Sequence, residues 1–63
     1  MTPGDYSKWV AAQLEPEFKL VKAEEWHLIF SRHEHGDTHS IECTLVTTKD
    51  KLHISVLFTA SPD

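Results

Sequence analysis

The chain has 63 residues and a formal net charge of −4, from ten acidic and six basic side chains. A chain of this length forms at most one domain, residues 1–63, and buries only about 60% of the surface that its unfolded form exposes. The basic residues are scattered instead of forming a stripe, which argues against nucleic-acid binding. No run approaches the roughly 18 apolar residues of a membrane span, and the single cysteine, Cys43, excludes a disulfide within the chain. We therefore expect a cytoplasmic protein that does not bind a membrane, and we expect no cofactor.

The first element is predicted to be a helix that begins after Thr2. Thr2 is a favourable N-cap, Pro3 suits the first helical position, and Asp5 stands three residues after the cap. The helix should end at about Glu15, because the residue before Pro16 is displaced from the α region. Its apolar face consists of Tyr6, Trp9, Val10 and Leu14, with Gln13 either hydrogen-bonded in the same stripe or at its border.

Four strands are predicted to follow the helix. The first covers about residues 17–22, where apolar and polar side chains largely alternate. A three-residue turn after it would place Leu20 opposite Leu28 and Phe18 opposite Phe30. All connections are short, so the expected fold is α+β, of the type αββββ: an N-terminal helix packed on one face of a four-stranded antiparallel meander.

Two dipeptides set the predicted register of the last three strands. With Gly36-Asp37 as the first two-residue loop, Leu28 falls opposite Leu45. With Lys49-Asp50 as the second, Leu45 falls opposite Ile54. The same count pairs Phe30 with Cys43, Cys43 with Val56, and Ile41 with Phe58. Because a one-residue slip would turn a strand inside out, this agreement predicts one continuous apolar inner face, with Leu45 at its centre and Cys43 as a buried thiol.

Histidines are the chemistry-bearing residues that occur in unusual number: the chain has five, and three of them fall in the segment HEHGDTH, as His33, His35 and His39. Imidazole and carboxylate groups of this kind bind zinc, copper or nickel, which makes a histidine-based transition-metal-binding domain the alternative function. In the predicted register, however, His33 and His35 point to the outer face and His39 to the inner face. His27 and His53 are separated on the outer face by Val46. We therefore assign no metal ligands.

A catalytic function is not expected. Arg32, Glu34 and His39 share the inner face near one end, and they are the acid, base and cation that a hydrolase or lyase would need. No nucleophile accompanies them, and the chain has neither a glycine-rich phosphate loop nor the length for a closed pocket. A salt bridge between Arg32 and Glu34, or a hydrogen bond between Glu34 and His39, is the simpler interpretation, and no catalytic residue is assigned.

A protein-binding module remains. A helix of this length rises about 18 Å at ~1.5 Å per residue, whereas the longer strands extend nearly 30 Å at ~3.3 Å per residue, so one helix cannot cover the whole inner face. The far end, with Phe30, Ile41 and Phe58, is either shielded by the N-terminal residues and the twist of the sheet or exposed as an apolar patch. The last strand also has an unpaired edge without proline or charge between Ile54 and Ala60. We therefore predict a homo-oligomer or a complex with another protein. The candidate interface residues are Ile29, Val46, His53, Leu57 and Phe58.

Overall fold

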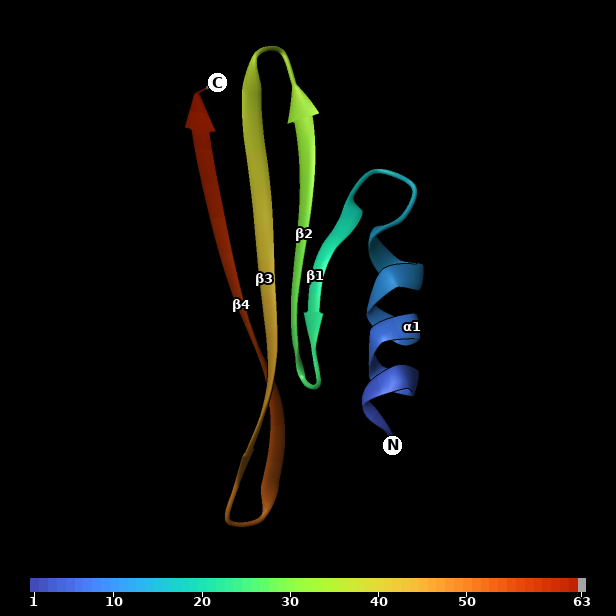
Figure 1. Cartoon of the computed structure of the whole chain (residues 1–63). Coiled ribbons are helices and arrows are strands. Elements are labelled where there is room, and N and C mark those ends of the chain that lie inside the picture. The colour runs from blue at the N-terminus through green and yellow to red at the C-terminus, as the bar shows by residue number, and fades with distance from the viewer. Residues whose placement is uncertain (63) are drawn as a thin grey trace.

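The computed structural model describes residues 1–62 and contains one helix and four strands. The elements are α1 (Pro3–Leu14), β1 (Lys19–Glu24), β2 (His27–Glu34), β3 (Asp37–Thr48) and β4 (Lys51–Pro62). The strands form one antiparallel sheet in the order β1-β2-β3-β4, and α1 lies beside β1 (Figure 1). The predicted α+β meander is therefore confirmed. No helix within residues 1–62 is long and apolar enough to cross a membrane.

The helix begins and ends where the sequence predicts. The backbone N–H of Asp5 donates to Thr2 Oγ1 at 3.1 Å, and the backbone N–H of Thr2 donates to a carboxylate oxygen of Asp5 at 3.4 Å, which completes a capping box. At the other end, the N–H of Glu15 donates to the carbonyl oxygen of Ala11 at 2.8 Å, and Glu15 itself is extended ahead of Pro16. The predicted face is only half buried: Tyr6 and Val10 are buried, whereas Trp9 and Gln13 are exposed.

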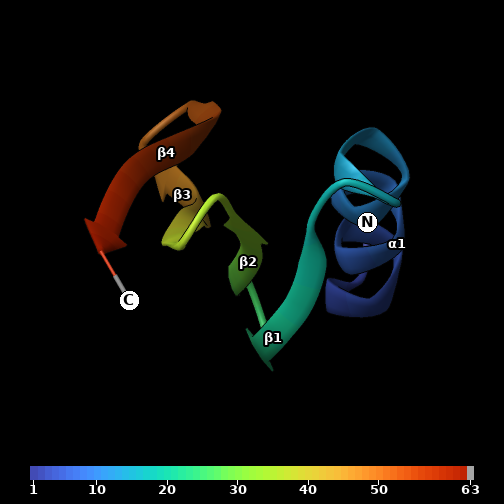
Figure 2. The same cartoon turned by 90° about the horizontal axis from the view of Figure 1, so that it is seen from above.

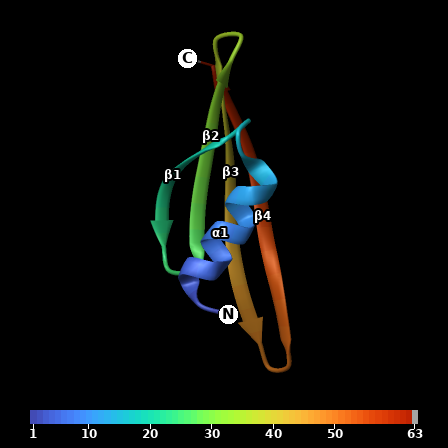
Figure 3. The same ribbon diagram turned by 90° about the vertical axis from the view of Figure 1, so that its right-hand side faces the viewer.

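The core lies between α1 and the middle of β2 and β3. Seven residues are buried in one cluster: Tyr6, Val10, Phe18, Leu28, Phe30, Ile41 and Cys43. In Figure 3, α1 crosses the face of the sheet, and in Figure 2 β4 is the strand farthest from it. Phe18 donates its backbone N–H to the carbonyl oxygen of Leu14 at 3.0 Å, so the connection from α1 to β1 is tight. This short connection holds the helix near one edge of the sheet, where a cylinder about 10 Å wide spans only two or three strands spaced ~4.8 Å apart.

The predicted β2–β3 register is wrong by two residues. The loop is His35-Gly36, with φ values of 50° and 81°, rather than Gly36-Asp37. A two-residue hairpin turn of type I′ needs positive φ at both central residues, and this placement puts glycine at the second of them. Leu28 therefore pairs with Cys43, and Phe30 pairs with Ile41. Because the shift is an even number, every side chain keeps its predicted face, but Leu45 moves from the centre to the rim of the core.

The predicted β1–β2 pairing is also wrong, whereas the β3–β4 pairing is confirmed. Strand β1 begins later than predicted, and its turn is Glu25-Trp26. Leu20 pairs with Phe30 instead of Leu28, and an irregularity between Leu20 and Lys22 shifts the register. In β3–β4, the predicted partners of Cys43, Leu45 and Ile41 are all observed, as Val56, Ile54 and Phe58 respectively.

The molecule is elongated, with extents of 42 × 19 × 17 Å. Strands β3 and β4 have twelve residues each, and their hairpin extends past the β1–β2 turn (Figure 1). Val46 to Thr48 of β3 pair with β4 but not with β2. Much of the longest hairpin therefore lies outside the core.

Candidate interaction surface

Strand β4 is exposed along its whole described length. All twelve of its residues are exposed, although five of them are large and apolar. The exposed fractions of these side chains run from 38% for Ile54 to 69% for Phe58, and the other three are Leu52, Val56 and Leu57. Single exposed apolar side chains are ordinary, but four of these five lie on the inner face of β4 and form a patch of the kind found at interaction sites, whereas Leu57 lies on the outer face.

An apolar groove separates α1 from β4. It consists of two adjoining hollows of about 350 and 270 Å³, which both include Trp9 of α1 and Ile54 of β4. The first hollow is completed by Met1, Tyr6, Leu45, Leu52 and His53. The second is completed by Val10, Gln13, Leu14, Ile41, Cys43, Val56 and Phe58. The inner row of β4 thus forms one wall of a groove that α1 is too far away to fill.

The outer face of β4 continues a second, mixed row across the sheet. Leu57 pairs with Glu42 of β3, which pairs with Ile29 of β2. Glu42 Oε1 lies 3.0 Å from His27 Nε2, so the carboxylate between the two apolar residues has a polar partner. Apolar and hydrogen-bonding groups therefore alternate across this face.

The structure divides the five predicted interface residues between the two faces. Phe58 lies on the inner side, in the groove, and Leu57 on the outer side of the same strand. Ile29 and Val46 are half buried on β2 and β3, and His53 is exposed opposite Val46. The sequence analysis did not assign Trp9, Leu52, Ile54 or Val56 to the surface. For the far end of the inner face, with Phe30, Ile41 and Phe58, it left open either shielding or an exposed patch. Phe30 and Ile41 are buried and Phe58 is exposed, and the uncovered region follows β4.

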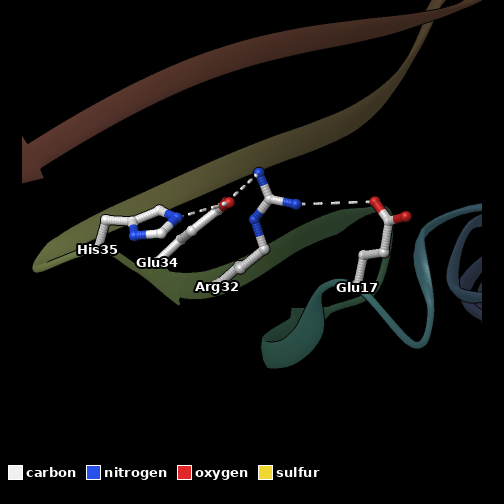
Figure 4. Close-up of polar contacts among 4 residues, drawn as sticks. All are labelled: Glu17, Arg32, Glu34 and His35. Atoms are coloured by element: carbon white, nitrogen blue, oxygen red, sulfur yellow. Dashed lines mark ion pairs between the residues drawn. The ribbon is translucent and has the colours of Figure 1, made fainter.

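Ion pairs connect basic and acidic side chains near the β2–β3 turn (Figure 4). Arg32 Nη2 lies 2.9 Å from Glu34 Oε2, and Arg32 Nη1 lies 3.7 Å from Glu17 Oε2. Nε2 of His35 approaches Glu34 Oε1 at 3.7 Å, and the guanidinium carbon of Arg32 lies 4.8 Å from the ring centre of Phe18. The predicted Arg32–Glu34 salt bridge is confirmed. Two carboxylates and an aromatic ring therefore surround the Arg32 guanidinium.

The histidines do not converge. His33 Nδ1 lies 3.0 Å from Thr38 Oγ1, His35 projects from the turn, and His39 lies opposite Arg32. The predicted pairing of Val46 with His53 is confirmed, but the predicted pairing of Val46 with His27 is wrong, because the shifted register places Thr44 opposite His27. Within residues 1–62, no three histidine, cysteine, aspartate or glutamate side chains are grouped so that they could hold a metal ion.

Two buried groups favour their neutral forms. Burial raises the pKa of the Cys43 thiol above its ordinary value of 9.0. Burial, followed by the proximity of Cys43, raises the pKa of the Tyr6 hydroxyl above 10.0. A thiol in this environment is a packing group and a poor nucleophile.

No family model, curated protein or solved structure matches this chain. The surface described above is therefore the basis for the functional proposal.

Proposed function

We propose that this chain is a small, non-catalytic protein-binding module that associates with a second copy of itself through β4. In a larger assembly the pair would serve an accessory, adaptor or inhibitory role. The observation that carries the proposal is the complete exposure of β4, a strand whose residues from Ile54 to Ala60 include four large apolar side chains and no charge.

The free edge of β4 supports pairing. Strand β4 is the last strand of the described sheet, so one side of its backbone has no neighbouring strand within residues 1–62. Natural proteins protect such edges with charges, prolines or bulges, and β4 has none of these between Ile54 and Ala60. The opposite edge of the sheet, β1, is by contrast short, irregular and carries Lys19, Lys22 and Glu24.

Strand β4 has twelve residues, about half of the roughly 20–30 that a standard interface uses on each side. A standard protein interface buries about 800 Å² per partner, roughly one sixth of the 4726 Å² that this chain exposes. Twelve of the 62 described residues belong to β4, and all twelve are exposed. The groove beside it is lined mainly by apolar residues, with Gln13 and His53 as its exposed polar ones, which supports a binding role over catalysis.

Sedimentation equilibrium of the wild type, from about 1 to 500 μM, tests the proposal, because self-association makes apparent mass and stability depend on concentration. We expect a reversible dimer. The variant Leu57→Lys should weaken it by about tenfold or more, since it places a charge on the outer side of the pairing strand. Val21→Lys is the matched control: Val21 is 63% exposed, close to the 57% of Leu57, but lies on the opposite edge strand. A wild type that is monomeric at every concentration, or a control that dissociates the dimer equally, would contradict the proposal.

A further inference from the structure

The hydrogen-bond phase of the sheet fixes which residues of β4 face the free edge. The N–H of Leu45 donates to the carbonyl oxygen of Trp26 at 2.9 Å, so odd-numbered residues of β3 bond to the β2 side. Backbone groups in an antiparallel strand alternate between its two neighbours, and Thr44 and Val46 therefore bond to β4. Their partners are Ser55 and His53. The odd-numbered residues of β4 thus point their N–H and C=O groups toward β3, and the even-numbered residues point theirs outward.

The same even-numbered residues carry the apolar inner row. Leu52, Ile54, Val56 and Phe58 line the groove beside α1, and Ala60 continues the row. A strand added at this edge would therefore bond to the residues whose side chains form the wall of the groove. Its own alternate side chains would lie beside that wall.

We propose that the added strand is β4 of a second copy, antiparallel, with Val56 opposite the partner subunit's Val56. This inference rests on the proposed self-association and specifies its geometry: one continuous sheet of eight strands about a two-fold axis perpendicular to the sheet. Such an axis keeps both helices and both apolar rows on the same face. A parallel pair related by a two-fold would set the inner row of one copy beside the outer row of the other.

The register follows from the requirement that all outward-facing groups be paired. When the two strands are centred on Val56, Ile54 lies opposite the partner subunit's Phe58, and Leu52 lies opposite the partner subunit's Ala60. Each of the five outward-facing residues then lies opposite an outward-facing residue of the partner strand. Pro62, which has no N–H, lies beyond this stretch. If the two-fold axis is moved along β4 in either direction, at least one outward-facing residue loses such a partner. It then lies opposite Pro62, opposite the Lys49-Asp50 turn, or opposite no residue. Lys51 lies opposite Ser61, so no like charges meet.

Amide hydrogen exchange measured by NMR tests edge pairing residue by residue. Spectra are compared at concentrations below and above the dissociation constant found by sedimentation. We expect the amides of Ile54, Val56 and Phe58 to exchange at least about tenfold more slowly in the dimer. The amides of Ser55 and Leu57 bond to β3 in either state and serve as internal controls. A dimer in which the even-numbered amides gain no protection overturns edge pairing but leaves self-association intact, whereas the absence of any dimer overturns both.

Disulfide cross-linking tests the register. In the proposed dimer, the two Val56 Cα atoms are about 5.5 Å apart, which is within the span of a disulfide. Val56→Cys should therefore form covalent dimers under mild oxidation. Ala60→Cys, on the same strand and face, is the matched control, because its two copies are offset by eight residues, or roughly 26 Å. The wild type, whose Cys43 is 5% exposed, measures the background. Faster cross-linking at position 60 than at position 56 would overturn the register.

Discussion

The backbone N–H of Leu45 donates to the carbonyl oxygen of Trp26 across 2.9 Å, and this single bond locates Leu45 at the rim of the core. Trp26 occupies the turn between β1 and β2, so Leu45 lies one residue past Thr44, the last residue of β3 that pairs with β2. The centre of the core is instead occupied by Leu28 and Phe30, both completely buried. The same bond fixes how backbone hydrogen bonds alternate across the sheet. As a result, the N–H and C=O groups of Val56 and the other even-numbered residues of β4 point toward the free edge.

Leu28→Ala should destabilise the protein much more than Leu45→Ala. Leu28 is completely buried, so its truncation should cost about 2–5 kcal/mol through lost contacts and a residual cavity. Leu45 is only partly buried, and we expect its truncation to cost about 1–2 kcal/mol. Urea denaturation at a concentration where the chain is monomeric measures both. Equal losses in the free energy of unfolding would instead support the register predicted from the sequence, in which Leu45 is central.

The two glycines should respond to alanine with opposite signs. Gly36 has a φ of 81° in the β2–β3 turn, and a Cβ there meets nothing within 4 Å, so Gly36→Ala should destabilise the fold by about 1 kcal/mol through backbone strain alone. Gly4 lies in the first turn of α1, where a Cβ would meet only Thr2 Oγ1 at an ordinary 3.8 Å. Gly4→Ala should therefore stabilise by about 0.5–1 kcal/mol. Thermal denaturation of the two variants side by side provides the comparison, and a shift in the same direction for both would contradict it.

Tyr6→Phe should leave stability unchanged or raise it by up to about 1 kcal/mol. The hydroxyl of Tyr6 is buried and has no hydrogen-bond partner within residues 1–62, while its ring packs against Trp26 with centroids 5.7 Å apart. The substitution removes an unsatisfied polar group and keeps the ring. Tyr6→Ala, which removes the ring as well, should cost about 3–5 kcal/mol. A clear loss of stability in Tyr6→Phe would reveal a hydrogen-bonding partner, such as a buried water or the Cys43 thiol.

Stability should fall as the pH rises above about 9. Burial raises the pKa of Cys43 above 9.0 and that of Tyr6 above 10.0 in the folded chain. Between the unfolded and folded pKa values, the unfolded chain releases protons that the folded chain retains, so alkali favours unfolding. The contribution is complete below the unfolded pKa values and is lost as the pH passes through the folded ones. Urea midpoints from pH 7 to 11 under reducing conditions should show the decline, and Cys43→Val should reduce it. A flat or rising profile would contradict the burial of both groups.

The sequence alone was sufficient for the helix, the four strands, the assignment of side chains to faces and the β3–β4 pairing. These features depend on local signals: the cap at Thr2, the stop at Pro16 and period-two alternation. The β3–β4 register was correct because the Lys49-Asp50 turn was placed correctly. The β2–β3 register was not, because the dipeptides His35-Gly36 and Gly36-Asp37 both contain the glycine, and only the positive φ values at His35 and Gly36 distinguish them.

Only the tertiary structure decided where the sheet is left uncovered. The sequence predicted that one short helix cannot cover the whole inner face, but the position of that helix depends on the tight connection between Leu14 and Phe18, which holds α1 near β1. The uncovered area therefore follows the length of β4 and is not confined to one end of the sheet. Trp9 and Val10 are neighbours on one predicted helical face, yet Val10 enters the core and Trp9 borders the groove toward β4. Hydrophobic periodicity gives the direction of an apolar face, whereas the lateral position of the helix on the sheet is set by packing and chain connection.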